Sequence, residues 1–381
     1  MSDIIIKKVE TKSDMRRFIN FHYDLYAGNK YDVPNLFMDD EQTFSQEKNA
    51  AFEFCEAKFF LAMQGRKVVG RVAAIINHRA NEKWEQKNVR FGWIDFINDY
   101  SVSGALLQAV EEWGRSKGMT HCVGPLGFTD LDPEGMLTEG FNRLGTMSTI
   151  YNYPYYPDHM QHHEGYHVDN RYVEFHIPVP EKIPEKLVKI GEMIERRYNL
   201  HAVKFTKQQI FHEGIGETVF HLINDTYKDL YGYSELTDRQ IQQYCHMYLK
   251  MLDTEFITAV VDGNRDNEIV GIGIMMASLS KALQKCHRGS LWPLGWYHIL
   301  QALYNHKSEG IDLLLIGVKP EYRTKGANAL LFTDLVERAI RHGYKWAETN
   351  VEMETNKNVQ GQWDLFSPEL HKRRVCWKKE L

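Results

Sequence analysis

The chain has 381 residues, a formal net charge of -5 and a sequence pI of about 6.4. At roughly 100–200 residues per domain, this length favours two domains. The mild acidity gives no electrostatic reason to expect a nucleic-acid partner, for which a basic face is the usual footprint.

The N-terminal stretch, the lack of long apolar windows and the cysteines indicate a cytoplasmic protein without a membrane partner. The N-terminal stretch MSDIIIKKVETKSDM has a short apolar run and no small-residue cleavage site, so it does not resemble a signal peptide. No window approaches the ~20 apolar residues of a membrane-spanning helix. The five cysteines are scattered without a CxxC pair, which predicts reduced thiols and neither disulfides nor a metal site.

In the first half, short apolar runs around glycine turns predict strands, and an "ALL" segment ending at a glycine predicts a helix. The expected order is a hairpin at 58–77, a strand at 91–97, a helix ending near Gly118 and a strand at 120–128.

The stretch "IPVPEKIPEK" (177–186) contains three prolines and is typical of a linker or an extended crossover. A helical pattern starts at Leu187. We therefore place a domain boundary near residue 182, between domains 1–181 and 182–381.

The second half repeats the same order. A hairpin is expected at 255–277, a strand at 311–318, a helix ending near Gly343 and a strand at 345–353. One supersecondary unit used twice indicates an internal duplication.

The stretch "GVKPEYRTKGANALL" (317–331) joins that second strand to its helix. Pro320 has no N–H to donate, so the strand ends there, and a helix begins at Gly326 or Ala327. The first turn of a helix offers unpaired N–H groups and a partial positive charge, to which Arg323 and Lys325 add. This favours a pyrophosphate cradle. An ordinary turn with solvated charges remains the alternative.

The stretch from Val318 to Leu331 resembles motif A of the Gcn5-related N-acetyltransferase (GNAT) superfamily, and the element order of both halves is similar to that family's. More narrowly, the chain resembles a bacterial tandem GNAT group, through "GPLGFTDLDPEGMLTEGF" (124–141), "YNYPYYPDHMQHHEGY" (151–166) and "SLWPLGWYHIL" (290–300). The resemblance implies an α/β fold with a mixed sheet, built as two tandem GNAT-like acyl-CoA N-acyltransferase folds.

What the resemblance implies for the second half is an acetyl-CoA or other acyl-CoA site. Backbone groups of one strand would hold the pantetheine arm and polarise the thioester, and the turn would hold the pyrophosphate. The implied cofactor-binding residues are Ile316, Val318, Arg323, Lys325, Gly326, Ala327, Asn328, Ala329 and Asn356. For Asn356, helix N-capping is an equally open role.

Three positions depart from the family's pattern. Asn328 stands where the motif has Gly or Ala, and Trp363 stands where the family's proton-donating tyrosine is expected. The corresponding turn of the first half, "NDYSVSG" (98–104), has no basic residue and carries Asp99. We therefore predict a degenerate first half that binds no cofactor.

Glu348, Asn350, Glu352 and Glu354 share one parity, so on a continuous strand they would point to one face. We expect Glu348 or Glu352 to act as the catalytic base. A solvated or paired strand edge is the alternative, and Asp312 is a weaker candidate.

Two aromatic stretches are open to more than one interpretation. Tyr151, Tyr153, Tyr155 and Tyr156 would either line an acceptor pocket between the halves or close a core. The helical spacing of Trp292 and Trp296 favours core packing. Asp130, Asp132 and Gly135 begin like a calcium loop, but Phe141 stands at its decisive twelfth position, so no metal is expected.

The function predicted from the sequence is N-acetyl transfer from acetyl-CoA, or another acyl-CoA, to a small or peptidic amine held between the halves. The oligomeric state stays open. One alternative is a CoA-independent aminoacyl-transferase of the tandem GNAT fold that uses aminoacyl-tRNA. Another is a non-catalytic protein that binds CoA or a metabolite.

Overall fold

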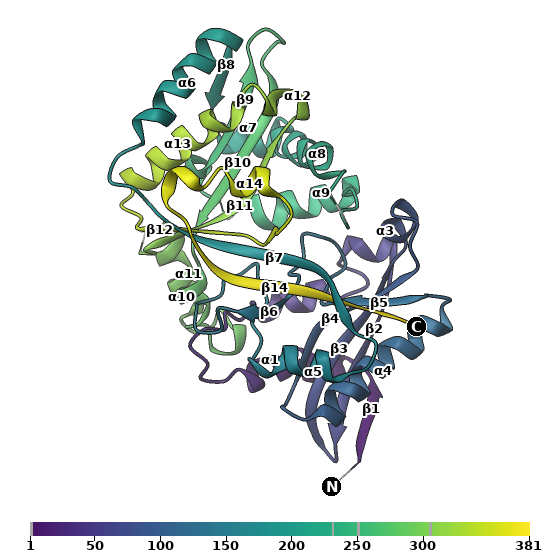
Figure 1. The fold of residues 1–381 in the computed structure, drawn as a ribbon. Coiled ribbons are helices and arrows are strands. Elements are labelled where there is room, and N and C mark those ends of the chain that lie inside the picture. Colours follow the sequence, from purple (N-terminus) through teal and green to yellow (C-terminus); the bar gives the residue numbers. More distant parts are fainter. Residues whose placement is uncertain (1–2, 231, 250–251, 305–306) are drawn as a thin grey trace.

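A computed structural model describes residues 3–230, 232–249, 252–304 and 307–381. In these residues one mixed sheet runs through two halves, with the first half purple to blue and the second green to yellow in Figure 1. Its strands are β1 (Ile4–Lys8), β2 (Cys55–Gln64), β3 (Lys67–Asn77), β4 (Asn88–Phe96), β5 (His121–Gly124), β6 (Met136–Glu139), β7 (His167–Pro178), β8 (Leu200–Val203), β9 (Ile257–Asp262), β10 (Glu268–Ala277), β11 (Gly310–Val318), β12 (Trp346–Thr349), β13 (Glu352–Met353) and β14 (Glu369–Glu380).

Helices cover both faces of this sheet. They are α1 (Lys12–Leu25), α2 (Phe37–Thr43), α3 (His78–Lys83), α4 (Tyr100–Ser116), α5 (Tyr155–His162), α6 (Glu185–Tyr198), α7 (Lys207–His212), α8 (Ile215–Tyr227), α9 (Asp238–Tyr244), α10 (Ser280–Leu283), α11 (Gly295–Tyr304), α12 (Pro320–Arg323), α13 (Ala327–Arg341) and α14 (Lys357–Gln360). In the second half α8 and α13 lie on opposite faces, because Gly317 faces Thr226 and Ile223 of α8 whereas Gly273 faces Leu335 of α13.

The duplicated unit predicted from the sequence is confirmed. β2 and β3 form one hairpin and β9 and β10 the other, and each is followed by a parallel strand pair, β4 with β5 and β11 with β12. α4 and α13 connect the strands of these pairs. Gly118 and Gly343, which follow the two helices, have positive φ angles of 74° and 75°, as helix-terminating glycines do.

The two halves exchange strands at the centre of the sheet, where the order is β5-β14-β7-β12. β7 pairs with β12 of the second half, and the C-terminal strand β14 returns to pair with β5 of the first. Figure 1 shows β7 and β14 running side by side from one half into the other. The sheet does not break near residue 182, and the domain boundary placed there stays a prediction.

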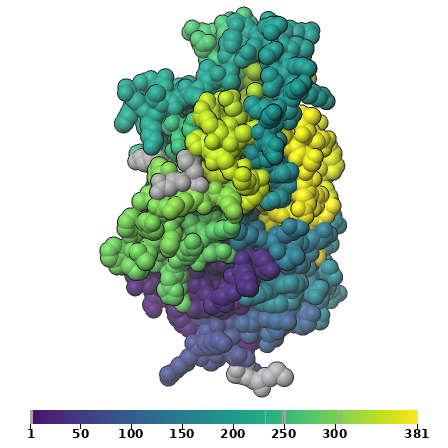
Figure 2. All heavy atoms as spheres, turned by 90° about the vertical axis from the view of Figure 1, so that its left-hand side faces the viewer, coloured from purple at the N-terminus to yellow at the C-terminus, as the bar shows by residue number. Residues whose placement is uncertain are grey.

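The core packing expected for Trp292 and Trp296 is wrong, since these side chains are 78% and 45% exposed. Helical spacing shows that residues share a face but not whether that face is covered. The segment that carries them protrudes, in light green, from the face shown in Figure 2. For the tyrosine stretch, the structure favours the core alternative, because Tyr151 and Tyr156 are buried in the first half.

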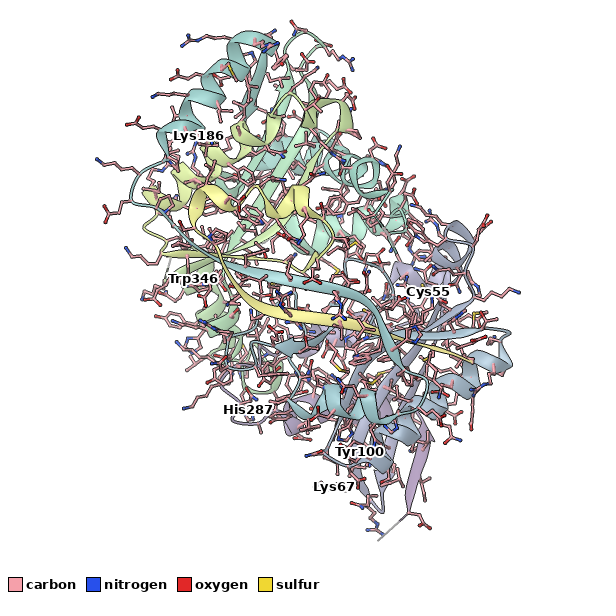
Figure 3. All side chains as sticks on the ribbon, viewed as in Figure 1. Cys55, Lys67, Tyr100, Lys186, His287 and Trp346 are labelled. Atoms are coloured by element: carbon pink, nitrogen blue, oxygen red, sulfur yellow. The ribbon has the colours of Figure 1, made fainter. Side chains whose placement is uncertain are left out.

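A buried network of charges joins the exchanged strands. Lys372 of β14 donates to Glu174 of β7 at 3.2 Å and to Glu348 of β12 at 2.5 Å, and Arg374 also binds Glu174. All four side chains are at most 3% exposed. Trp346, labelled in Figure 3, adjoins this network through its ring contact with His176. These opposite charges compensate one another at the junction of the halves.

None of the helices in the described residues combines the length and the apolarity needed to cross a bilayer.

Candidate active site

A cavity of about 310 Å³ lies in the second half, where it reaches the junction with the first. Its walls come from both faces of the sheet, with Phe332 and Leu335 of α13 on one side and Tyr227 of α8 on the other. Most of its lining is aliphatic or aromatic. The apolar lining residues include Ile177, Val179, Met275, Ile311, Leu313, Phe332, Leu335, Val336, Ala339, Val359 and Phe366.

The cavity exists because β11 and β12 separate. The two strands pair only from Gly310 with Trp346 to Leu313 with Thr349, and β11 then continues to Val318 paired with β10 on its other edge. Beyond Leu313 an extended ligand can lie along the free edge of β11.

Side chains donate hydrogen bonds to the carbonyl groups on that free edge. The Asn350 amide donates to the Leu314 carbonyl at 3.0 Å, the Tyr227 hydroxyl to that of Ile316 at 2.9 Å, and Arg323 Nε to that of Val318 at 2.9 Å. In an extended strand the N–H and C=O of one residue point to the same side. The N–H groups of Ile316 and Val318 therefore face the gap, where a thioester oxygen could accept from them.

The turn from Arg323 to Ala329 leads into a helix that begins at Ala327, as the sequence predicts. Gly326 is the N-cap of α13 with φ 81°, and a Cβ there would lie 2.9 Å from Ile194 Cδ1. No side chain caps this helix start. The Ala329 N–H already bonds the Gly326 carbonyl, so Ala327 and Asn328 carry the first N–H groups of the helix.

The two basic residues of the turn, Arg323 and Lys325, make different contacts. Arg323 ties the turn to α8, because its Nη2 also donates to the Thr226 carbonyl at 3.0 Å. Lys325 Nζ lies 4.1 Å from the centre of the Tyr322 ring. Lys325 is thus placed beside the helix start without an ion pair among the described residues, and Arg323 has a structural task whether or not it also meets an anion.

Glu352 lines the cavity and is held by Trp363. Trp363 Nε1 donates to Glu352 Oε1 at 2.9 Å, and no described residue bonds Oε2. Burial raises the pKa of Glu352 to about 7, although the Trp363 hydrogen bond opposes this rise. A carboxyl group with such a pKa can exchange a proton near neutral pH.

Glu348 has a different environment, so the prediction that it shares a face with Glu352 is wrong. The strand is interrupted between β12 and β13, and Glu348 points into the charge network, where it does not line the cavity. Burial raises the pKa of Glu348, but hydrogen bonds from His176 and His371 and the Lys372 charge bring it down to about 2. Asp312, its neighbour in register, does not line the cavity either.

His176, Glu348 and His371 bring potential metal-ligand atoms within 4.8 Å of one another. The Lys372 ammonium already lies 2.5 Å from Glu348 Oε1. That cation neutralises the carboxylate, and the donor set is poor for a metal ion.

Two further candidates from the sequence, Asn356 and Asp99, each cap a helix. Asn356 lines the cavity and also caps α14 by accepting from the Val359 N–H, so both of its predicted roles are compatible with its place. In the first half Asp99 caps α4 by accepting from the Ser101 N–H, which puts a carboxylate where the second half offers free N–H groups.

Two features of the cavity were missed from the sequence. Tyr227 reaches the Ile316 carbonyl across 89 positions of the chain, and no motif marks it. Asp130 and Asp132, set aside above as the start of a failed calcium loop, and the nearby Glu134 lie in the wall contributed by the first half. Burial raises the pKa of both aspartates to about 6 and that of Glu134 to about 8.

No protein-family model matches the chain. It is 24% identical over 368 residues to the bacterial ceramide synthase of Caulobacter vibrioides, covering 93% of this chain and 92% of the relative. It is 22% identical over 383 residues to protein YghO of Escherichia coli, covering 99% and 95%.

Two solved structures share the fold over nearly their whole length. A tandem GNAT protein from the clavulanic acid biosynthesis pathway superposes with a TM-score of 0.57 at 12% identity, over 99% of this chain and 98% of that one. A GCN5-related N-acetyltransferase from Sphaerobacter thermophilus gives 0.52 at 12% identity, over 99% and 95%. The chain therefore has the tandem GNAT fold.

Proposed function

We propose that this protein is an acyl-CoA-dependent N-acyltransferase that transfers a long acyl chain, rather than acetyl, to the amine of a lipid. The observation that carries the proposal is the apolar cavity that opens from the gap between β11 and β12. An acetyl group has one methyl beyond the thioester carbonyl and leaves such a cavity unfilled. Each methylene buried contributes about 0.8 kcal/mol.

The CoA moiety would bind outside the cavity. Its pantetheine arm would lie along the free edge of β11, with the Ile316 and Val318 N–H groups as donors. Its pyrophosphate would meet the start of α13 at Gly326, Ala327 and Asn328, with Lys325 beside it. The small side chains of Ala327 and Ala329 keep that helix start accessible.

In the proposed reaction the Glu352 carboxylate accepts a proton from the amine. The amine nitrogen forms a bond to the thioester carbonyl carbon, whose oxygen becomes negative and accepts from a β11 N–H. The C–S bond then breaks. The thiolate takes the proton of the Tyr227 hydroxyl, and Tyr227 is reprotonated from solvent, to which Glu352 releases the proton that it took from the amine. This assigns Tyr227 the role that Trp363 cannot fill.

The amine would approach from the first half. Asp130 and Asp132 line that wall, and with pKa values of about 6 they are ionised at neutral pH and attract an ammonium group. The ammonium group would lose a proton to solvent before it reacts as the amine. The similarity to a protein named a ceramide synthase supports a lipid amine, since a ceramide is the amide of a fatty acid with a long-chain amino alcohol.

The test is turnover of a long-chain amino alcohol with acyl-CoAs from acetyl to dodecanoyl. We expect kcat/KM to rise by about fourfold per methylene until the cavity is filled. The Val336→Trp variant fills part of the cavity and shifts the optimum to shorter chains. Glu337→Trp, at the next and exposed position of α13, is the matched control.

Equal use of acetyl and long-chain donors, or a Val336→Trp profile that matches the control, contradicts the proposal. Firm acyl-CoA binding without turnover across a broad panel of amines would favour a non-catalytic binding protein instead.

A further inference from the structure

Helix α11 and the loop before it carry an apolar surface that the fold does not cover. Six large side chains here are between 43% and 78% exposed. They are Trp292, Leu294, Trp296, Tyr297, Leu300 and Tyr304, which we call the α11 patch. Large apolar side chains gathered on one surface, rather than scattered singly, mark an interaction site.

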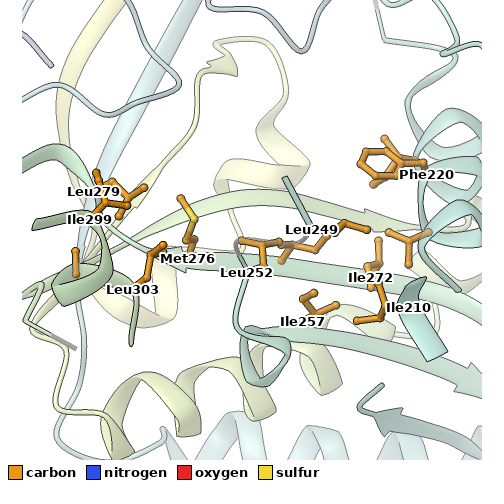
Figure 4. Close-up of a cluster of buried hydrophobic side chains, with 14 of the residues drawn as sticks. Ile210, Phe220, Leu249, Leu252, Ile257, Ile272, Met276, Leu279, Ile299 and Leu303 are labelled. Atoms are coloured by element: carbon orange, nitrogen blue, oxygen red, sulfur yellow. The ribbon is translucent and has the colours of Figure 1, made fainter. Parts of the chain in front are cut away.

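The patch is the outer face of a helix whose inner face is already packed. Ile299, Ala302 and Leu303 are buried in the second half's largest hydrophobic cluster, and Figure 4 shows Ile299 and Leu303 beside Leu279 there. Trp296, Leu300 and Tyr304 follow one another at intervals of four residues on the opposite side. The helix is apolar on both sides, although only one of them faces the protein.

Local hydrogen bonds fix the loop that presents the patch. Trp296 Nε1 donates to the Pro293 carbonyl at 3.0 Å, and the Ser290 hydroxyl donates to the Trp292 carbonyl at 3.0 Å. The exposed rings thus protrude in a set arrangement, and binding would cost little ordering.

The segment that carries the patch is basic, although the whole chain is acidic. Residues 269–308 contain no Asp or Glu but four Lys and Arg residues. Lys285 and Lys307 are exposed and form no ion pair with a described residue, whereas Lys281 and Arg288 pair with Glu309 and Asp24. An apolar surface with Trp and Tyr, flanked by free lysines, has the chemistry of a helix that lies in an anionic membrane interface.

We propose that the α11 patch docks the protein onto the surface of an anionic lipid bilayer. A second copy of the chain is a poorer occupant, because a symmetric contact would bring the lysines of both copies together. The patch also leads directly to the site, since α11 is followed by β11, whose Ile311 lines the cavity. Docking replaces the sequence-based expectation of no membrane partner, which rested on the lack of a spanning segment alone.

The test is flotation of the full chain, without acyl-CoA, with vesicles of phosphatidylcholine alone or mixed with phosphatidylglycerol. We expect binding to the mixed vesicles that weakens with added salt. The triple variant Trp292→Ser, Leu294→Ser, Trp296→Ser should lose at least tenfold in vesicle affinity. Matched changes at exposed apolar residues elsewhere, Met38→Ser, Met193→Ser and Leu370→Ser, should leave it unchanged.

A second variant separates charge from packing. Lys285→Glu with Lys307→Glu leaves the apolar side chains in place and should weaken binding to mixed vesicles by at least fivefold per lysine. Three results would overturn the proposal: no flotation with mixed vesicles, equal loss in the matched variant, or a wild-type dimer that the triple variant converts to monomer. Because no turnover is measured, this outcome is independent of the proposed activity.

Discussion

We expect replacement of Glu352 with Gln to lower kcat by about 10²–10⁴-fold, the usual contribution of a general base. The amide keeps the shape and the Trp363 hydrogen bond of the carboxylate but cannot accept the amine's proton. Acyl-CoA binding should persist, because Glu352 does not contact the turn at 323–329. Glu354→Gln is the matched control, since Glu354 is half-buried and pairs with Arg373.

The pH dependence of the activity also tests the role of Glu352 as the base. Glu352 acts as a base only when ionised, so activity should fall as pH drops below about 7, the raised pKa of this carboxyl group. Trp363→Phe removes the hydrogen bond that lowers this pKa, and the profile should move to higher pH. An unshifted profile in Trp363→Phe, or full activity in Glu352→Gln, would remove Glu352 from the mechanism.

Replacing Lys372 with Met lowers the free energy of unfolding by about 3–5 kcal/mol, as expected when one partner of a buried ion pair is removed. Glu174 would then keep Arg374 as its partner, and Glu348 would keep His176 and His371. Denaturant unfolding at neutral pH measures the loss. Lys378→Met is the control on the same strand, because Lys378 is 3.9 Å from Asp169 and more exposed, and its loss should be within about 1 kcal/mol.

Acid should reduce the difference between wild type and Lys372→Met. The pKa values of Glu348 and Glu174 are lowered by folding, so their pairing stabilises the fold above their ordinary pKa range. This contribution is lost as pH falls through the folded-state pKa, which is about 2 for Glu348. If the loss in free energy of unfolding of Lys372→Met is small at neutral pH, or unchanged in acid, the network does not stabilise the junction.

The hairpins, the parallel strands and the turn at Gly326 were predictable because their signals are local. Glycine turns, apolar runs and a helix start all lie within a few residues of the elements they define. The exchange of β7 and β14 was not, since pairing His121 with Glu380 joins positions far apart in the sequence. No local pattern records which distant strand completes a sheet.

The candidate site was predictable as a region but not as a set of side chains. Parity placed Glu348 and Glu352 on one face, but the break between β12 and β13 sends one to the charge network and the other to the cavity. Tyr227 and the carboxylates near Glu134 enter the cavity from other parts of the chain. Trp292 and Trp296 lie outside the core that their spacing favoured, because helical spacing alone does not reveal what covers a face.

We propose that CoA binds at the Gly326 turn with its acyl chain in the apolar cavity. Calorimetric titration of acetyl-CoA and dodecanoyl-CoA, below its micelle concentration, tests this most directly. We expect one-to-one binding that is at least a hundredfold tighter for dodecanoyl-CoA, and loss of affinity for both ligands in Lys325→Glu but not in Lys186→Glu, an exposed lysine distant from the turn. Equal affinity for the two ligands would contradict the assignment of the cavity, and no binding of either would contradict the acyl-CoA site itself.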